Sequence, residues 1–347
     1  MVVELKIEIV NPTYYKDWDD LLLTNDQSTF FQTSAWARVL ADSYSYKPLY
    51  FTIFDNRKIS ALIPIMQINS FLTGKRGVSL PFTDECPSIA SNAKQHEALI
   101  ETIIQYGKSA GWTHFELRGG NDYLADETPA ATFYTHHINL IEGESKIFSA
   151  FRNSNKRNIR RAGKKNVTVE LCHSSDALKE FYRMNVATRR RHGLPPQPYN
   201  FFKKIYDHIV SKKKGIVVLA KFQEKIVAGA IYLLFGDNVI YKYGASDTNY
   251  LKMRPNNFVM WQAIKWCIGN GFQRFSLGRT EPDHDGLLQF KRGWGAKEDI
   301  VKYYKYDLTS HSFVAENQAM KSSYKCFKIM PLAILRLTGN LLYRHVG

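Results

Sequence analysis

The chain of 347 residues is 44% hydrophobic and 14% aromatic, which is enough apolar surface for a large buried core and excludes a disordered polypeptide. Lysine and arginine (47) outnumber aspartate and glutamate (32), and the formal net charge of +15 favours polyanionic partners, whether nucleic acid, a phosphorylated cofactor or anionic lipid. The four cysteines (Cys86, Cys172, Cys267 and Cys326) lack metal-ligand spacing, no run of residues is apolar enough to span a membrane, and the first residues do not resemble a signal peptide. We therefore expect a cytoplasmic protein with reduced thiols and no metal.

A strand–turn–strand pattern occurs twice. "LYFTIFDNRKISALIPIMQI" begins at Leu49 and "VVLAKFQEKIVAGAIYLLF" begins at Val217, and in each copy a short polar turn interrupts two apolar runs. A third strand is predicted after each pair, over residues 77–82 and 239–245.

A helix–strand pair is repeated as well. "IIQYGKSAGWTHFELRGG" from Ile103 and "AIKWCIGNGFQRFSLGRT" from Ala263 align with an offset of 160 residues, which places Gly111 on Gly271. Each copy is typical of a helix that ends at a glycine and precedes a short strand. The matching order of elements predicts a duplicated α/β (α+β) fold. We expect one unit over residues 1–144, a second over 145–310, and a C-terminal tail over 311–347.

A basic helix is predicted within residues 145–166. Its positive side chains recur every four residues, with further cations beside them: Arg152, Lys156, Arg160 and Lys164, and Arg157, Arg161 and Lys165. Phe148, Phe151, Ile159 and Ala162 form the opposite, core-facing side. Like charges on one helix face repel each other, so the stripe either binds an anionic partner or is a solvated face.

A cluster of cations ends the next predicted helix. Arg189, Arg190, Arg191 and His192 precede Gly193 and a Pro-Pro pair, which are helix stop signals. These cations either compensate the helix dipole or clamp a phosphate or carboxylate group.

A strand, loop and helix follow one another between Tyr241 and Gly271. The loop crosses Arg254-Pro255-Asn256-Asn257, and a helix is expected to start around Phe258. Free N–H groups at such a helix start suit an anion such as the pyrophosphate of coenzyme A or an RNA phosphate.

The segment "SLGRTEPDHDGLLQFKRGWGAKE" (276–298) concentrates polar residues after a predicted buried strand. Asp283, His284 and Asp285 lie on a loop where they could accept a proton. The alternative is that they cap the helix that follows, and Asp285 is expected to be its N-cap. Trp294, between two glycines, is expected to pack beneath the loop.

The last residues alternate apolar and basic side chains. Residues 325–345 could pack back on the first unit or lie on a membrane surface as a basic amphipathic helix.

Four segments carry a family resemblance. "GASDTNYLKMRPNNFVMWQAIKWCIGNGFQRFSLGRTEPDHDGLLQFKRGWG" resembles the FemAB-like members of the GNAT acyltransferase superfamily. "FRNSNKRNIRRAGKKNVTVE", "RRRHGLPPQPYNFF" and, more loosely, "FFQTSAWARVL" are similar to further landmarks of that family. The resemblance implies two tandem GNAT-like units, each a mixed, largely antiparallel sheet flanked by helices, with the active site in the second. Carried over to this sequence, the lysine of the family's "FK" motif is Lys291, and its implied role is phosphate binding or charge stabilisation.

The resemblance implies acyl or aminoacyl transfer to an amine of a cell-envelope or polysaccharide precursor, with acyl-CoA or aminoacyl-tRNA as donor. Two departures matter: the chain lacks the Lys- and Glu-rich helical hairpin of some tRNA-dependent members, and it has Arg-Pro-Asn-Asn where GNAT enzymes carry a Gly-rich loop. Because the donor ester is already activated, direct attack without a covalent intermediate is expected.

The candidate residues fall into three groups. Catalytic candidates are Lys291, Asp283, Asp285 and His284; donor-binding candidates are Arg254, Asn256, Asn257 and Phe258; and substrate-binding candidates are Arg189, Arg190, Arg191, Tyr243, Arg279, Arg160 and Arg161. Expected partners are the donor, a phosphorylated or lipid-linked sugar or peptide acceptor, tRNA, and the inner membrane face through residues 325–345. The alternative is a non-catalytic RNA-binding module that uses residues 151–165.

Overall fold

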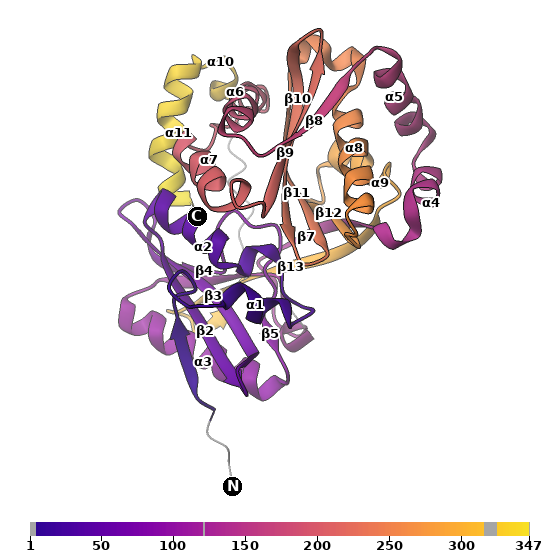
Figure 1. Ribbon diagram of the computed structural model, residues 1–347. Helices are drawn as coiled ribbons and strands as arrows, with labels where there is room; N and C mark the ends of the chain where they lie inside the picture. Colours follow the sequence, from indigo (N-terminus) through magenta and orange to yellow (C-terminus); the bar gives the residue numbers. More distant parts are fainter. Residues whose placement is uncertain (1–4, 121, 316–324, 347) are drawn as a thin grey trace. The chain divides into compact units, whose positions relative to one another are not determined.

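The computed structural model describes residues 5–120, 122–315 and 325–346 (Figure 1). It divides the chain into two compact units that are each discontinuous in sequence. Unit 1 comprises residues 1–133, 300–321 and 342–347, and unit 2 comprises residues 134–299 and 322–341. The predicted boundary between the two duplicated segments, at residues 144 and 145, stays a prediction. Residues 316–324 of the predicted tail lie outside the described residues.

Unit 1 is built on a mixed sheet with the strand order β1-β2-β3-β4-β6-β13, with β5 beside β3 and β14 beside β13. Its elements are β1 (Ile7–Val10), α1 (Trp18–Leu23), η1 (Phe30–Gln32), α2 (Ser34–Tyr44), β2 (Lys47–Asp55), β3 (Lys58–Ser70), β4 (Gly74–Val78), β5 (Ile89–Ala90), α3 (Ala93–Ala110), β6 (His114–Arg118), η2 (Asp122–Leu124), most of β13 (Lys297–Asp307) and β14 (Ser312–Phe313).

Unit 2 has the strand order β7-β12-β11-β10-β9-β8. Its elements are most of β7 (Ala131–Asn139), η3 (Leu140–Glu142), α4 (Gly143–Ala150), α5 (Asn153–Lys164), β8 (Thr168–Cys172), α6 (Ser175–Arg191), α7 (Tyr199–Ile205), η4 (Tyr206–Val210), β9 (Gly215–Phe222), β10 (Lys225–Phe235), β11 (Asn238–Ser246), η5 (Thr248–Met253), α8 (Pro255–Gly269), β12 (Arg274–Thr280), α9 (Asp285–Arg292), α10 (Lys325–Ile329) and the first part of α11 (Leu332–Val346). In Figure 1, α8 and α9 lie on one side of strands β9 to β11, and α6 and α7 lie on the other.

The predicted duplication is confirmed. The order β2, β3, β4, α3, β6 of unit 1 recurs as β9, β10, β11, α8, β12 in unit 2. In each unit the strand before the helix and the strand after it pair in parallel, and the other strand pairs are antiparallel. Even the hairpin turns agree: Asn56-Arg57 and Gln223-Glu224 each have two successive positive φ angles, the geometry of a two-residue turn that matches strand twist.

Each unit has its own apolar core between a sheet and its long helix. In unit 1, Leu99 and Ile103 of α3 pack with the inward residues of β2 and β3. In unit 2, Val259, Met260 and Ile264 of α8 pack with β9, β10 and β12. Among the described residues, no helix has both the length and the apolar character that crossing a membrane requires.

The single helix predicted over residues 145–166 is wrong: the chain forms α4 and α5 with a break at Phe151 and Arg152. Both residues are extended, with ψ angles of 144° and 141°. The Phe151 ring packs edge-on against Trp294, and the Arg152 N–H donates to the carbonyl of Gly293 at 2.9 Å. These tertiary contacts take the N–H that a continuous helix would use.

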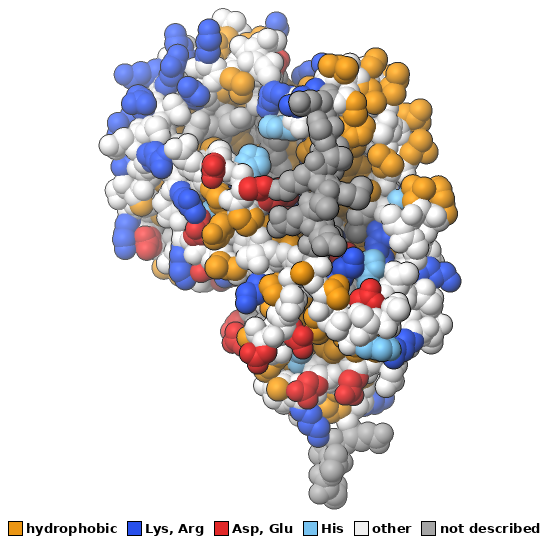
Figure 2. Space-filling view, turned by 180° about the vertical axis from the view of Figure 1, so that it is seen from behind, with side chains coloured by type: hydrophobic (Ala, Val, Ile, Leu, Met, Phe, Trp, Pro, Cys, Tyr) orange, Lys and Arg blue, Asp and Glu red, His pale blue; other side chains and the backbone are white. Residues whose placement is uncertain are grey.

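The basic stripe is nevertheless exposed along α5. Ile159 and Ala162 are buried, whereas Arg157, Arg160 and Arg161 face solvent. Figure 2 shows lysine and arginine side chains gathered over this helix.

Candidate active site

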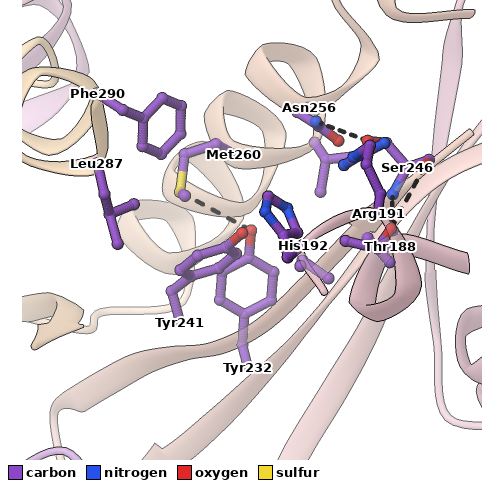
Figure 3. A pocket seen from close by; sticks show the side chains of 15 residues that line it. Thr188, Arg191, His192, Tyr232, Tyr241, Ser246, Asn256, Met260, Leu287 and Phe290 are labelled. Carbon is purple, nitrogen blue, oxygen red and sulfur yellow. Dashed lines mark hydrogen bonds between the residues drawn. The ribbon is translucent and has the colours of Figure 1, made fainter. Parts of the chain in front are cut away.

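A cavity of about 300 Å³ lies within unit 2, beside the part of β11 that extends beyond its parallel pairing with β12. Strands β11 and β12 pair over Asn238–Ile240 and Arg274–Ser276; beyond this register β11 pairs with β10 and β12 pairs with β7. The residues around the cavity come from β10, β11, α6, α8 and α9 (Figure 3): Thr188, Arg191, His192, Gly229, Ala230, Tyr232, Tyr241, Gly244, Ala245, Ser246, Asn256, Val259, Met260, Leu287 and Phe290.

Two tyrosines form one wall of this cavity because of a β-bulge. The register between β10 and β11 shifts from Ile231–Tyr243 to Tyr232–Tyr241, so Lys242 is an extra residue. A bulge of this kind re-aims the side chains on either side of it. Tyr241 therefore faces the cavity beside Tyr232, whereas Tyr243 packs against Phe202 with ring centroids 5.3 Å apart.

The tyrosine hydroxyls are neutral hydrogen-bond donors at physiological pH. Burial raises the pKa of Tyr241 to about 12, and it raises the pKa of Tyr232 well above the ordinary value. The Tyr241 hydroxyl also occupies the space in which a Cβ on Gly244 would lie, so glycine at 244 leaves room for this ring. Tyr232 and Tyr241 are not among the site residues predicted from the sequence.

His192 lies at the rim of the cavity with its ring directed inward (Figure 3). Partial burial lowers the pKa of His192, and the positive charges of Arg191 and Arg189 lower it further. The imidazole is therefore neutral at neutral pH and can accept a proton. The sequence places His192 in the predicted cationic cluster with the arginines, but it does not predict a catalytic role for this histidine.

A second cavity of about 340 Å³ adjoins the first and is strongly basic. Its lining residues are Arg183, Met184, Ala187, Arg190, Arg191, Ser246, Asp247, Thr248 and Lys328. Arg191 and Ser246 line both cavities. Four cations face one acid, so this cavity suits an anionic group. The structure thus brings two of the predicted clamp arginines, Arg190 and Arg191, to one cavity.

The start of α8 differs from the prediction. The helix begins at Pro255, three residues before Phe258, because proline is favoured at the first helical position and Arg254 adopts a left-handed conformation (φ 60°). Of the four predicted donor-binding residues, only Asn256 lines the cavity, and its Nδ2 donates to Ser246 Oγ at 3.1 Å. The Asn257 Nδ2 donates to Asn155 of α5 at 3.3 Å, the Phe258 ring packs against the core, and Arg254 is exposed.

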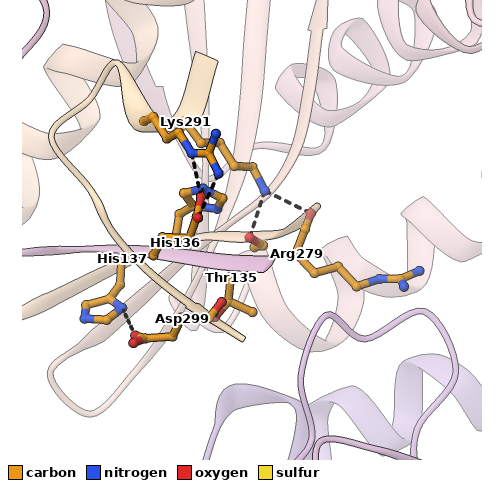
Figure 4. A network of polar contacts seen from close by, with 9 residues as sticks. Thr135, His136, His137, Arg279, Lys291 and Asp299 are labelled. Atoms are coloured by element: carbon orange, nitrogen blue, oxygen red, sulfur yellow. Dashed lines mark hydrogen bonds and ion pairs between the residues drawn. The ribbon is translucent and has the colours of Figure 1, made fainter. Parts of the chain in front are cut away.

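Lys291 belongs to helix α9 and is buried, with 3% of its surface exposed. Its side chain reaches the end of strand β12. Its ammonium group donates to the backbone carbonyls of Gly278 and Arg279 at 2.8 and 2.9 Å (Figure 4). Gly278 has a φ of 70° and lies in an irregular stretch of β12, where carbonyl groups leave the ladder. Lys291 therefore holds the strand end in place. The phosphate-binding role implied by the family motif stays a prediction.

A charged network continues from Lys291. The positive charge of Lys291 lowers the pKa of His136, although burial of this ring is the larger cause. His136 Nε2 lies 2.8 Å from a Glu298 oxygen, and Arg292 makes two contacts of 2.8 Å with the same carboxylate. The Arg292 guanidinium holds the pKa of Glu298 below its usual range. The network fixes α9 against β7 and β13 in unit 2.

The expectation that Asp285 is the N-cap of α9 is wrong. The N-cap is His284, whose Nδ1 accepts from the Leu287 N–H at 3.3 Å, and Asp285 is the first helical residue. An acid there is favourable because it faces the positive end of the helix dipole. Asp283, His284 and Asp285 are all exposed, and none of them lines the 300 Å³ cavity. Trp294 is fully buried and packs against Phe151 and Phe290; its predicted position beneath the loop stays a prediction.

The remaining substrate-binding candidates lie apart from the two cavities. Arg189 Nε donates to the Pro195 carbonyl at 3.3 Å, and the Arg160 guanidinium lies 5.7 Å from the Phe148 ring. Arg161 is exposed on α5, and Arg279 is half-buried with its carbonyl bound to Lys291. Their roles in binding remain predictions. Among the described residues, no group of three or more histidine, cysteine or acidic side chains is placed to hold a metal ion.

Comparisons with known proteins agree with this fold. Residues 149–292 match the model of a family described as an acetyltransferase (GNAT) domain. The chain is 20% identical over 285 residues to a lipid II:glycine glycyltransferase of Staphylococcus epidermidis, covering 60% of this chain and 67% of the relative. It is 25% identical over 138 residues to a UDP-N-acetylmuramoylpentapeptide-lysine N(6)-alanyltransferase of Weissella viridescens, covering 39% and 40% of the two chains.

A solved structure extends the likeness to both units. The crystal structure of FemX superposes with a TM-score of 0.71 and 15% identity, covering 88% of this chain and 98% of that one. At this identity the likeness shows the fold. The GNAT match, the transferase relatives and the duplicated sheet together support the predicted resemblance to FemAB-like members of the GNAT superfamily.

Proposed function

We propose that this protein is an aminoacyltransferase that takes an amino acid from aminoacyl-tRNA and adds it to an amine of a peptidoglycan precursor. The observation that carries the proposal is the cavity of unit 2, which combines apolar walls, a buried tyrosine hydroxyl and a neutral histidine at its rim. The names of the relatives describe glycyl and alanyl transfer, which supports an aminoacyl donor.

The reaction needs a positioned ester, a proton acceptor and a donor for the oxyanion. The amine nitrogen of the acceptor attacks the ester carbonyl carbon, so that a C–N bond forms and the C–O bond to the ribose breaks. His192 takes the proton from the amine and passes it to the departing ribose oxygen. The Tyr241 hydroxyl donates to the carbonyl oxygen as negative charge develops there. No covalent enzyme intermediate is needed.

The cations of unit 2 supply the binding of phosphates. We assign the basic second cavity, with Arg190 and Arg191, to the phosphates of the acceptor. The exposed stripe of α5 is suited to the backbone of the tRNA, whose binding would then weaken steeply with salt. Peripheral contact with the membrane, predicted for residues 325–345, would bring the enzyme to a lipid-linked acceptor.

A transfer assay with three donors tests the proposal. Purified protein is given glycyl-tRNA, alanyl-tRNA or acetyl-CoA, with UDP-N-acetylmuramoyl pentapeptide or lipid II as acceptor. We expect transfer from an aminoacyl-tRNA. Transfer from acetyl-CoA alone would show that the donor is an acyl-CoA rather than aminoacyl-tRNA. Binding of tRNA without any transfer would favour the RNA-binding module.

The His192→Gln variant tests the mechanism. We expect kcat/KM to fall by roughly a hundredfold, because glutamine cannot accept the proton. In the wild type, kcat/KM should rise with pH up to the pKa of His192, which lies below the ordinary 6.5, and then level off. An unchanged acid limb in His192→Gln would assign the proton acceptor elsewhere, with His284, Asp283 and Asp285 as the next candidates.

A further inference from the structure

The last helix, α11, exposes an apolar stripe. Ile334, Leu337 and Leu341 are spaced at i, i+3 and i+7, which places them on one face of the helix. Their exposed fractions are 52%, 58% and 60%. In the preceding helix α10, Ile329 is 87% exposed. Figure 2 shows hydrophobic side chains gathered over these two helices.

The other face of α11 already makes the packing contacts. Leu335 is fully buried, and Gly339 is buried so close to the Pro196 carbonyl that a Cβ there would clash with it. Arg336 lies over the Tyr182 ring with a separation of 6.0 Å. The helix is therefore held by one face, and the stripe of aliphatic side chains serves no packing purpose among the described residues. A contiguous exposed apolar surface of this kind marks an interaction site.

The charge of this segment selects the partner. Residues 317–347 contain five lysines and arginines and no aspartate or glutamate. Lys328 adjoins the exposed Ile329, and Arg344 adjoins the stripe three residues after Leu341; both side chains are exposed. Aliphatic side chains flanked by cations, with no acid, complement a lipid surface in which anionic headgroups cover apolar acyl chains. A second copy would instead bring two cationic segments together.

Exposed apolar side chains also lie beside the last turn of the helix. In unit 1, the Phe71 ring contacts the His345 ring with centroids 4.6 Å apart and is 85% exposed, and Leu72 is 58% exposed. The Ser70 hydroxyl and the Arg76 guanidinium bond to His345, so this turn is firmly held.

We propose that the outer face of α10 and α11, formed by Ile329, Ile334, Leu337, Leu341 and Arg344, docks on the surface of an anionic lipid bilayer, with Lys328, which also lines the second cavity, at its margin. The helix lies in the plane of the interface, with the stripe among the upper acyl chains and the cations at the phosphates. This inference deepens the proposed function, since it gives the enzyme a place beside a lipid-linked acceptor, but it requires no transfer reaction.

Sedimentation with vesicles tests the proposal directly. The full chain, without substrates, is mixed with vesicles of phosphatidylglycerol and phosphatidylcholine, or of phosphatidylcholine alone. We expect binding to the anionic vesicles that is reduced by high salt. The double variant Leu337→Glu/Leu341→Glu should lower the vesicle partition coefficient about tenfold or more, because it places carboxylates on the stripe that enters the acyl chains.

A matched variant separates the stripe from a general effect of added charge. Leu23→Glu/Ile141→Glu makes the same change of charge at two apolar residues that are 50% and 71% exposed elsewhere. It should bind vesicles like the wild type, and circular dichroism checks that both variants fold. The proposal is overturned if the wild type does not sediment, if both variants bind equally, or if light scattering shows a dimer that the Leu337→Glu/Leu341→Glu variant dissociates. Transfer to the soluble UDP-linked acceptor should be unchanged in both variants, so failure here leaves the proposed function standing.

Discussion

The two units use the same elements but differ at the point where their parallel strands end. In unit 1 the chain after β4 continues along β6: the Ser79 N–H donates to the Glu116 carbonyl, and Ser79 Oγ accepts from the Arg118 N–H at 2.6 Å. The Cys86 N–H then donates to the Arg118 carbonyl. In unit 2 the parallel pairing ends at Ile240 and Ser276, and the part of β11 beyond it lines the 300 Å³ cavity.

The residues that close unit 1 are held from a third strand. Tyr303 of β13 donates its hydroxyl hydrogen bond to the carbonyls of Thr83 and Asp84, at 3.3 and 2.8 Å. Leu80 and Phe82 have positive φ angles, so the chain turns there rather than continuing the strand predicted to residue 82. In unit 1 the chain's own backbone thus occupies the strand ends, whereas in unit 2 we propose that a ligand binds there. The difference teaches that two units can share a fold without sharing a site, and we propose that the site of this protein lies in unit 2.

The two units should differ most in their response to acid, which should lower stability through unit 1 and activity through unit 2. His96 of α3 in unit 1 is 2% exposed, and burial lowers its pKa to about 4. In the unfolded chain His96 binds a proton near pH 6.5, whereas in the folded chain it does so only near pH 4. The free energy of unfolding therefore falls as the pH drops from 6.5 towards 4. The full loss is roughly 3 kcal/mol of unfolding free energy.

Urea unfolding of wild type and His96→Leu at pH 7.5, 5.5 and 4.5 measures this loss. The wild type should lose more stability on acidification than the variant. Equal losses would show that His96 is not the group responsible. In unit 2, by contrast, the acid sensitivity should concern activity, through His192.

Removing the buried ammonium group of Lys291 in unit 2 should have the next largest effect on the free energy of unfolding. Lys291→Met leaves the carbonyls of Gly278 and Arg279 without their donor and should cost about 2 kcal/mol of unfolding free energy. Transfer activity should fall as well, because the end of β12 loses its support. The adjacent Arg292→Gln breaks an exposed ion pair with Glu298 and should cost less than about 1 kcal/mol. Equal costs in thermal unfolding would argue against a bracing role for Lys291.

Two serines at equivalent strand ends give a sharper test. Ser79→Ala in unit 1 removes the acceptor for the Arg118 N–H and should cost about 1–2 kcal/mol of stability with little change in kcat/KM. Ser246→Ala in unit 2 removes the acceptor for Asn256 at the cavity and should cost less stability but lower kcat/KM several-fold. If both variants changed stability and activity alike, the proposed division of roles between the units would fail.

The duplication could be predicted because its signals are local. The polar turns at Asn56-Arg57 and Gln223-Glu224, and the helix ends at Gly111 and Gly271, depend on residues that favour positive φ or interrupt an apolar run. Such signals survive in a single sequence, and the structure places a turn or a helix end at each of them.

The predictions from the sequence are wrong or incomplete where contacts between distant residues determine the local structure. "YKY" at 241–243 predicts two tyrosines on one face of a strand, but the bulge at Lys242 separates them, and nothing in the local pattern indicates a bulge. The helix break at Phe151 depends on Trp294 and Gly293, which lie more than 140 residues further along the chain. The cavity wall and the rim position of His192 therefore could not be derived from spacing.

The central claim is that the transferred group enters the cavity of unit 2. Met260→Trp should fill that cavity, and Ile264→Trp makes the same change one turn further along α8, in the core but away from the cavity lining. Ile264→Trp overpacks the core and should cost about 1–3 kcal/mol of stability, and Met260→Trp should cost no more because its ring enters the cavity. In the aminoacyl transfer assay, we expect Met260→Trp to lower kcat/KM by about two orders of magnitude because the ester can no longer be positioned, whereas folded Ile264→Trp keeps most of its activity. Folded Met260→Trp with wild-type kcat/KM would contradict the account.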